Sequence, residues 1–182
     1  RGALHRRFRM PSRKNGYTQV GEGWGELRLA FLNEVNGWVW DYQNHPWQIV
    51  GQVDGRRFKY RPDSIRVLID GTIEVIEVKR TFEDLRDPEL REVLGQVAEI
   101  CRQCGCKFRV LYLDDIIVND DHQHNVDALF GRRYLTLTIK QERICRSMRL
   151  SGNVLDWTEA SEKLQTDDPL EADAILEYAA SR

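Results

Sequence analysis

Residues 64–69 and 73–79 form two short runs rich in β-branched and other apolar residues, with Asp70-Gly71 between them. Two such runs joined by Asp-Gly are typical of a β-hairpin. In the second run, apolar residues occupy both parities, which favours a central strand that is buried on both faces. The pattern therefore predicts a hairpin in the middle of a sheet, with residues 73–79 as its inner strand.

Two other segments carry apolar residues at the spacing of an amphipathic helix. The first helix is expected over about 22–35, because Gly37 follows its end. The second should begin at Asp87-Pro88, with proline in its first turn, and end before Gly105. Both helices are predicted to pack on the sheet.

Further strands are expected on either side of the hairpin, at 38–42, 47–53, 57–60 and 107–113. Strands followed by a helix and a last strand predict an α/β (α+β) fold, in which helices flank a mixed β-sheet and one helix forms a crossover. Three tryptophans are expected to pack in the core or to face nucleic-acid bases, namely Trp38, Trp40 and Trp47.

Both ends of the chain differ from its middle. We predict a basic N-terminal arm without regular structure over 1–20, a core over 21–116, and a small α-rich region over 117–182. The last region should be irregular up to residue 133 and then contain a short strand and three helices, at 134–139, 140–149, 157–165 and 169–180. It is interpreted as a winged-helix-like or partner-binding unit, or as a stabilising appendage.

Composition is that of a globular protein, with 41% hydrophobic and 31% charged residues in a chain of 182. No apolar run approaches the ~18 residues that a membrane helix needs, so no membrane association is expected. Four cysteines in a chain of this size do not indicate a secreted disulfide scaffold, and a cytoplasmic location is expected.

The net charge is only −2, but the charges are unevenly distributed. Residues 1–20 carry six cations and no acid, whereas residues 151–182 carry eight acids and two cations. The basic segment suits a DNA backbone or is a disordered terminus, and both interpretations stay open. The acidic segment suits a protein partner or contributes solubility.

Whether the hairpin can hold a site depends on its loop. Side chains alternate along a strand, so Glu77 and Lys79 share a face. A two-residue turn would place Asp63 on the opposite face. A three-residue loop over 69–71, with Gly71 in the left-handed region, sets Asp63 opposite Glu77. A functional site at this hairpin therefore predicts the three-residue loop or a bulge.

The carboxylates of Asp63 and Glu77 on adjacent strands are hard oxygen ligands that suit one Mg²⁺ or Mn²⁺ ion. Lys79 beside them would position an attacking water and stabilise developing negative charge. The alternative is a cross-strand salt bridge on a solvated face of the sheet. Because the strand is predicted to be buried on both faces, we favour the metal site.

A third carboxylate is expected to reach this site from the helix over 22–35. Glu26, near the start of that helix, is the first candidate, with Glu34 and Glu22 as alternatives. An acid in a first helical turn also stabilises the helix macrodipole, so a structural role for Glu26 stays open.

Pro62-Asp63, followed after thirteen residues by Glu77-Val78-Lys79, resembles the signature of PD-(D/E)xK nucleases. Further segments occur in the order seen in TnsA-like transposon-end endonucleases, a resemblance that covers roughly residues 8–116. These segments are Pro11-Ser12-Arg13-Lys14-Asn15-Gly16, Gly21-Glu22-Gly23-Trp24-Gly25-Glu26, Tyr42-Gln43-Asn44-His45-Pro46 and Arg61-Pro62-Asp63. The chain differs from that family at Gly23-Trp24-Gly25, where the family has Ser-x-Leu, and at His45, where it has Gln.

The resemblance implies a restriction-endonuclease-like core and hydrolysis of one DNA strand at the 5′ ends of a transposon, leaving a 3′-hydroxyl and a 5′-phosphate. It implies Mg²⁺, with Mn²⁺ as a substitute, held by Asp63, Glu77, the Val78 carbonyl and Glu26, with Lys79 positioning the water. The implied partners are double-stranded DNA, a strand-transfer transposase subunit and an ATPase regulator that binds the C-terminal region. A homo-oligomer is also compatible.

Other residues are expected to support this chemistry. Gln96 and His45 are accessory candidates near the site. The predicted DNA-binding cations are Arg6, Arg7, Arg9, Arg13, Lys14 and Arg80.

Two alternatives to this function stay open. One is the same nuclease chemistry in restriction, phage defence or phage DNA processing. The other is a non-catalytic DNA-binding or assembly module, although such a module has no need for Asp63, Glu77 and Lys79 together.

Overall fold

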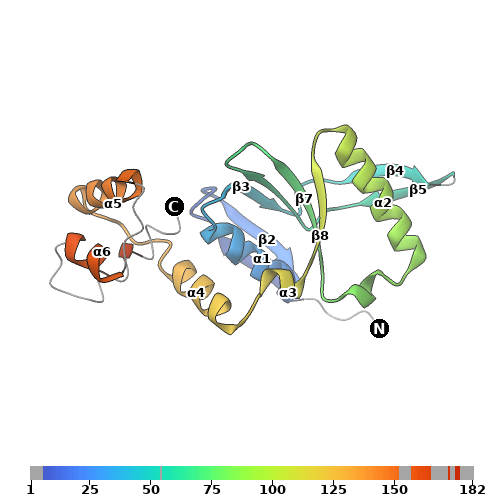
Figure 1. Cartoon of the computed structure of the whole chain (residues 1–182). Helices are drawn as coiled ribbons and strands as arrows, with labels where there is room; N and C mark the ends of the chain where they lie inside the picture. Colours follow the sequence, from blue (N-terminus) through green and yellow to red (C-terminus); the bar gives the residue numbers. More distant parts are fainter. Residues whose placement is uncertain (1–5, 54, 152–156, 165–171, 173–174, 177–182) are drawn as a thin grey trace.

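A computed structural model of the chain describes residues 6–53, 55–151, 157–164, 172, 175 and 176 (Figure 1). Its strands are β1 (Arg7–Pro11), β2 (Thr18–Glu22), β3 (Val39–Asn44), β4 (Ile49–Val53), β5 (Arg56–Tyr60), β6 (Ser64–Leu68), β7 (Ile73–Lys79) and β8 (Lys107–Tyr112). Its helices are α1 (Gly23–Val35), the 3₁₀ turn η1 (Phe82–Leu85), α2 (Pro88–Gln103), α3 (Leu113–Ile116), α4 (Asp120–Gly131), α5 (Ile139–Ser151) and α6 (Trp157–Leu164). None of the helices in these residues is long and apolar enough to cross a membrane.

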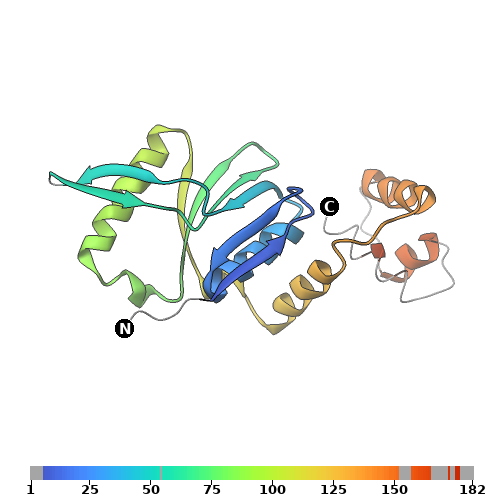
Figure 2. The same ribbon diagram turned by 180° about the vertical axis from the view of Figure 1, so that it is seen from behind.

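The centre of the fold is a four-stranded mixed sheet with the order β3-β6-β7-β8. β6 pairs antiparallel with β3 and with β7, and β8 lies parallel to β7. α2 connects the two parallel strands, as a parallel pair requires a crossover. The predicted mixed sheet flanked by helices is thereby confirmed (Figures 1 and 2).

Alternate residues of β7 belong to two different cores. Val75 packs with Leu94 and Val97 of α2, whereas Ile76 packs with Leu29 of α1. Both β7 side chains are completely buried. The consecutive apolar residues of β7 therefore correspond to a strand that is covered on both faces.

The β6–β7 hairpin has the predicted three-residue loop. Ser64 lies opposite Ile76, and at the other end the Leu68 N–H donates to the Thr72 carbonyl oxygen at 2.8 Å. Gly71 has a φ of 82°, in the region that glycine adopts without steric cost. Asp63 and Glu77, which carry the two predicted carboxylates, are the next residues beyond the Ser64–Ile76 pair.

The prediction that the N-terminal segment lacks regular structure is wrong, because β1 and β2 form an antiparallel hairpin. Phe8 and Met10 face the core between α1 and β3, while Arg7 and Arg9 face solvent. Cationic and apolar residues thus alternate with the period of a strand, which the density of positive charge obscured. The first five residues of the predicted arm, 1–5, lie outside the described residues.

Glu34 of α1 anchors the loop of this hairpin. Its buried carboxylate accepts four hydrogen bonds, from the Ser12 hydroxyl and the Tyr42 hydroxyl, both at 2.7 Å, and from the N–H groups of Arg13 and Lys14 at 2.8 and 3.0 Å. Burial and the charge of Glu34 raise the pKa of the Tyr42 hydroxyl, which therefore keeps its proton and donates. Glu34 serves the fold, at a distance from the strand ends that carry the site.

The stretch up to residue 133 was predicted to be irregular, which is also wrong. Asn119 caps α4, since its Oδ1 accepts the His122 N–H at 2.8 Å. α4 packs on α1, where the rings of Phe31 and Phe130 stack with centroids 3.7 Å apart. This part of the C-terminal region therefore extends the core around α1.

A second, smaller core follows α4. Among the described residues, 134–139 contains no strand; instead Leu135 and Leu137 pack on helices. The helices predicted at 140–149 and 157–165 are confirmed as α5 and α6, and the one predicted at 169–180 falls mainly outside the described residues. The buried members of this core are Cys145, Ala160, Leu164, Ala172, Ile175 and Leu176.

The side chains of Trp38, Trp40 and Trp47 are exposed. The expectation that they pack in the core is therefore wrong. β3 is an edge strand, and its register with β6 shifts between Val39 and Asp41. A bulge of this kind changes which way the intervening side chain faces, and Trp40 is 73% exposed. The expectation that these side chains contact bases stays a prediction.

We predict that Glu34→Gln destabilises the fold by about 1–3 kcal/mol, because an amide leaves part of a buried set of donors without an acceptor. Urea denaturation followed by far-UV circular dichroism measures the effect. Glu92→Gln, on the exposed face of α2, is the matched control and should change stability little. Equal stability of the two variants would contradict the anchoring role of Glu34.

Candidate metal centre

Two strand ends meet where the β3–β6 ladder stops. Asn44, the last residue of β3, pairs with Ser64, the first residue of β6. The next residues, His45 and Asp63, remain joined because the His45 N–H donates to the Asp63 carbonyl oxygen at 2.9 Å. The ladder thereby brings a histidine and an aspartate side by side.

His45 has a strained backbone. Its φ is 46°, and no other non-glycine residue in the described part of the chain has a positive φ. Pro46 follows, and the residue before a proline is normally restricted to extended conformations. Such a conformation costs about 1–3 kcal/mol and persists only where surrounding contacts hold it. One of these contacts joins the His45 Nε2 atom to the Glu26 Oε2 atom, 2.8 Å away.

Glu26 reaches the strand ends from the first turn of α1. Its Oε2 accepts the Glu22 N–H at 2.9 Å and also contacts His45 Nε2. Because a carboxylate oxygen is an acceptor, Nε2 is the donor in this contact. Burial raises the pKa of Glu26, and the Glu22 N–H and His45 offset part of that rise.

Gly25 lets α1 come close to β7. A Cβ atom at this position would lie 2.8 Å from Val78 Cγ1, closer than such atoms approach one another. Gly25 therefore allows the close approach of helix and strand, and with it the position of Glu26.

The Asp63 carboxylate is held at the end of the sheet by a backbone amide. Its Oδ2 accepts the Val78 N–H at 2.7 Å, in the place that a ladder carbonyl would occupy if β6 began earlier. Burial, and next the negative charge of Glu77, raise the pKa of Asp63 from 3.8 to about 8, against the lowering effect of the Val78 N–H. Without a cation, the surroundings of this carboxyl favour its protonated form.

Glu26, His45 and Asp63 each offer one ligand atom, and these atoms lie within 4.8 Å of one another. Carboxylates suit Mg²⁺ and Mn²⁺, while imidazole suits the transition ions. The raised pKa of Asp63 is a second indication, because a cation would stabilise its ionised form. The three residues therefore fit one divalent cation, and Mn²⁺ accommodates both ligand types.

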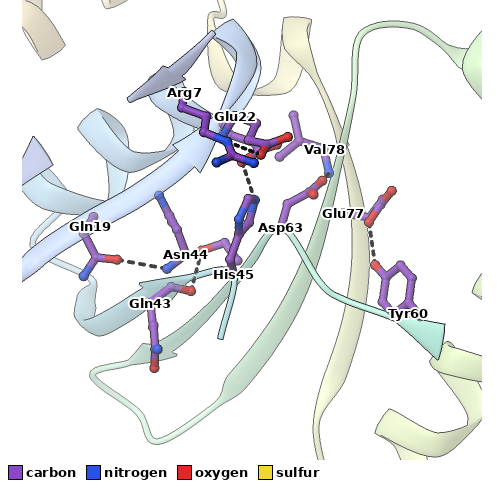
Figure 3. A network of polar contacts seen from close by, with 12 residues as sticks. Arg7, Gln19, Glu22, Gln43, Asn44, His45, Tyr60, Asp63, Glu77 and Val78 are labelled. Atoms are coloured by element: carbon purple, nitrogen blue, oxygen red, sulfur yellow. Dashed lines mark hydrogen bonds and ion pairs between the residues drawn. The ribbon is translucent and has the colours of Figure 1, made fainter. Parts of the chain in front are cut away.

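Figure 3 shows Glu77 on the other side of Asp63, beside Tyr60. Its carboxylate accepts the Tyr60 hydroxyl at 2.5 Å and pairs with Lys79 Nζ at 2.5 Å. Among the described residues, Glu77 does not join the group of three ligand atoms. The predicted pair of carboxylates is thus only partly assembled, since the charge of Glu77 acts on Asp63 but its oxygens are engaged elsewhere.

The remaining predicted ligands have different surroundings. Val78 faces Asp63 with its N–H, whereas the resemblance implied its carbonyl as the ligand. The Glu22 side chain pairs with Arg7 at 3.0 Å, and Glu34 anchors the N-terminal hairpin. Of the three candidate carboxylates, only Glu26 reaches the group.

The predicted DNA-binding cations fall into two groups. Arg13 and Lys14 are half-buried, and both side chains donate to backbone carbonyl oxygens. The acceptors of Lys14 lie at the end of α1 and at the first residue of β3. Gln96, the second accessory candidate, is exposed on α2. It lines neither the cavity that Glu26 lines nor the one that His45 lines. The exposed cations are Arg6, Arg7, Arg9 and Arg80.

Two open cavities flank the three candidate ligands. One has a volume of about 590 Å³, and Glu26, Lys79 and Arg80 line it. The other has a volume of about 510 Å³, and its lining includes His45, Arg61 and the two arginines of β1. Arg61 was not among the predicted DNA-binding cations, although its place two residues before Asp63 was a usable signal. Positively charged side chains therefore line both cavities beside the carboxylates.

Comparison with known proteins assigns the chain to no family. No protein-family model matches it, and a search of curated proteins finds no significant similarity.

We predict that Asp63→Asn stabilises the metal-free protein, and that the gain grows between about pH 4 and pH 8. Below pH 4 the carboxyl is protonated in both the folded and the unfolded chain; as the pH rises, the unfolded chain ionises while the folded one resists until its pKa of about 8. The wild type therefore loses stability across this window, and the amide does not. Thermal melts in EDTA at a series of pH values measure the difference.

Asp114→Asn, at an exposed position of α3, is the control and should follow the wild type at every pH. A difference between Asp63→Asn and wild type that stays constant from pH 4 to pH 8 would show that Asp63 ionises normally in the folded chain.

Proposed function

We propose that this protein is a metal-dependent DNA endonuclease with a restriction-endonuclease-like core, acting at transposon ends. The observation that carries the proposal is the convergence of Asp63 with Glu26 and His45 at the end of the central sheet. The Glu77–Lys79 pair lies next to this group on the inner strand. Metal-dependent cleavage of a phosphodiester uses acidic ligands for the ion and benefits from a positive charge beside them.

Asp63, Glu26 and His45 would hold the divalent cation, with Mn²⁺ or Mg²⁺ as the candidates. A bound cation of this kind polarises a phosphoryl oxygen and lowers the pKa of a nearby water. The Val78 N–H keeps Asp63 in place, and Glu22 does the same for Glu26 through its own N–H. Both carboxylates are therefore oriented before a substrate arrives.

Lys79 supplies the positive charge on the other side of the scissile phosphate. Its Nζ is held by Glu77 and faces the same cavity as Glu26. From there it positions the attacking water and stabilises the negative charge that develops on the phosphate. The water oxygen bonds to phosphorus as the bond to the 3′-oxygen breaks, which leaves a 3′-hydroxyl and a 5′-phosphate.

Action at transposon ends is the more specific part of the proposal, and it rests on the resemblance of residues 8–116 to TnsA-like endonucleases. In that setting the protein works with a strand-transfer transposase and an ATPase regulator. The helical unit around the second core, which includes α5 and α6, is the candidate binding site for the regulator. The same chemistry in restriction or phage DNA processing would use the same residues.

We predict that the wild type binds one Mn²⁺ per chain in a calorimetric titration, and more tightly than Mg²⁺ because of the histidine. Asp63→Asn should weaken Mn²⁺ binding by at least about 10–100-fold, the loss that supporting residues alone can cause. His45→Ala should bring the Mn²⁺ and Mg²⁺ affinities closer together. Glu83→Gln, an exposed acid on η1, is the control for unspecific loss of charge.

The proposed ligand set is wrong if Asp63→Asn binds Mn²⁺ like the wild type. If instead Glu77→Gln abolishes binding and Glu26→Gln does not, the ion belongs to the Asp63–Glu77 pair that the sequence signature implies.

We further predict that Lys79→Ala retains Mn²⁺ binding but slows DNA cleavage by about 100-fold or more, as expected for the loss of a group that acts on the reacting water. Nicking of supercoiled plasmid in Mn²⁺, with the transposase partner added in a parallel series, measures the rate. Lys107→Ala, an exposed lysine at the start of β8, is the control. Undiminished cleavage by Lys79→Ala would remove this residue from the mechanism.

A further inference from the structure

One face of the β4–β5 hairpin carries Arg57 and Lys59, whereas Arg56, next to the loop, lies on the opposite face. Val50 lies opposite Lys59 and Gln52 lies opposite Arg57, and directly opposed residues of an antiparallel pair share a face. All four side chains are exposed. In both views of the molecule this hairpin extends past the four-stranded sheet (Figures 1 and 2).

The other face of the same hairpin fixes it to the protein. Ile49, Phe58 and Tyr60 pack with the core beneath α2. The Phe58 ring covers Gly51, where a Cβ atom would lie only 2.4 Å from the ring. The hairpin is therefore held through its apolar face, and its cationic face is presented to solvent in a defined orientation.

Arg61 extends this row of cations to the candidate metal centre. It follows β5 directly, is exposed, and lines the same cavity as His45. Alternate residues of an extended chain are roughly 6.6 Å apart, so Arg57, Lys59 and Arg61 form a row about 13 Å long. The row ends two residues before Asp63.

These cations are not neutralised by the protein itself. Within the described part of the chain, none of the three forms an ion pair, whereas Arg7, Arg66 and others do. The segment from 47 to 61 contains four cations and a single acid, in a chain whose net charge is −2. Segregated, unpaired and regularly spaced charge is the arrangement that a polyanion complements.

We propose that the outer face of the β4–β5 hairpin, through Arg57, Lys59 and Arg61, binds the phosphate backbone of DNA and guides it to the candidate metal centre. The identity of the ligand as DNA rests on the proposed function. Contacts to phosphate position a protein without reading sequence, so this surface binds duplexes of any sequence. An anionic membrane is disfavoured, because the row leads into a group of carboxylates rather than a flat cationic surface.

The test is the salt dependence of DNA binding, measured by fluorescence anisotropy with a short labelled duplex in EDTA, so that no cleavage takes place. Each lost phosphate contact lowers the slope of log K against log salt by about 0.9. Arg57→Gln/Lys59→Gln/Arg61→Gln should therefore lower it by up to about 2.7. Arg91→Gln/Lys140→Gln/Arg143→Gln removes the same charge from exposed positions elsewhere and should leave the slope nearly unchanged.

Arg57→Lys/Arg61→Lys keeps the charges and should retain the wild-type slope, which separates loss of contacts from damage to the hairpin. Equal slopes for the two triple glutamine variants would overturn the inference, as would wild-type binding to anionic phospholipid vesicles but not to DNA. The failure of this inference and the failure of the nuclease proposal give different results. A reduced slope in a protein that never cleaves DNA supports the hairpin surface and defeats the enzyme, and cleavage with an unchanged slope does the reverse.

Discussion

The position of β6 between β3 and β7 decides which side chains can meet at the end of the sheet. Asn44 pairs with Ser64 on one side, and Ser64 pairs with Ile76 on the other. One residue further on, Asp63 therefore has His45 as one neighbour and Glu77 as the other. A shift of either register by one residue would turn the whole set to the opposite face. The three-residue loop closed by Gly71 sets one of these registers through local geometry alone.

Three neighbouring carboxylates repel one another, and the structure stabilises their negative charges to different extents. Glu26 has an N–H donor and His45, and Glu77 has the Tyr60 hydroxyl and Lys79. Among the described residues, the Val78 N–H is the donor to the Asp63 carboxylate, and burial together with the charge of Glu77 raises the pKa of Asp63 to about 8 against the lowering effects of this N–H and of Lys79. Ionisation is thus most unfavourable at Asp63, which lies between the other two carboxylates, and this is the residue whose ionised form a divalent cation would stabilise most.

The β6–β7 hairpin and the two sheet-covering helices were predictable because their signals are local: β-branched runs, an Asp-Gly turn, and apolar residues at helical spacing. The N-terminal hairpin was not, since its cations suggested an arm although its apolar residues alternate with the period of a strand. The β3–β6 register could not be predicted from the sequence, because the two strands are not consecutive and a bulge at Trp40 shifts their pairing. The backbone hydrogen bond between His45 and Asp63 follows from that register, so the sequence offered His45 only as an accessory candidate.

The backbone of His45 bears on whether this arrangement is merely structural. A left-handed conformation before a proline is unfavourable for histidine, and glycine or asparagine would adopt it at lower cost. A turn at the end of β3 therefore does not by itself account for a histidine here. What the histidine adds is a ring nitrogen 2.8 Å from Glu26 and within 4.8 Å of Asp63. A strained backbone that brings a ring beside two carboxylates is more typical of a functional site than of a solvated salt bridge.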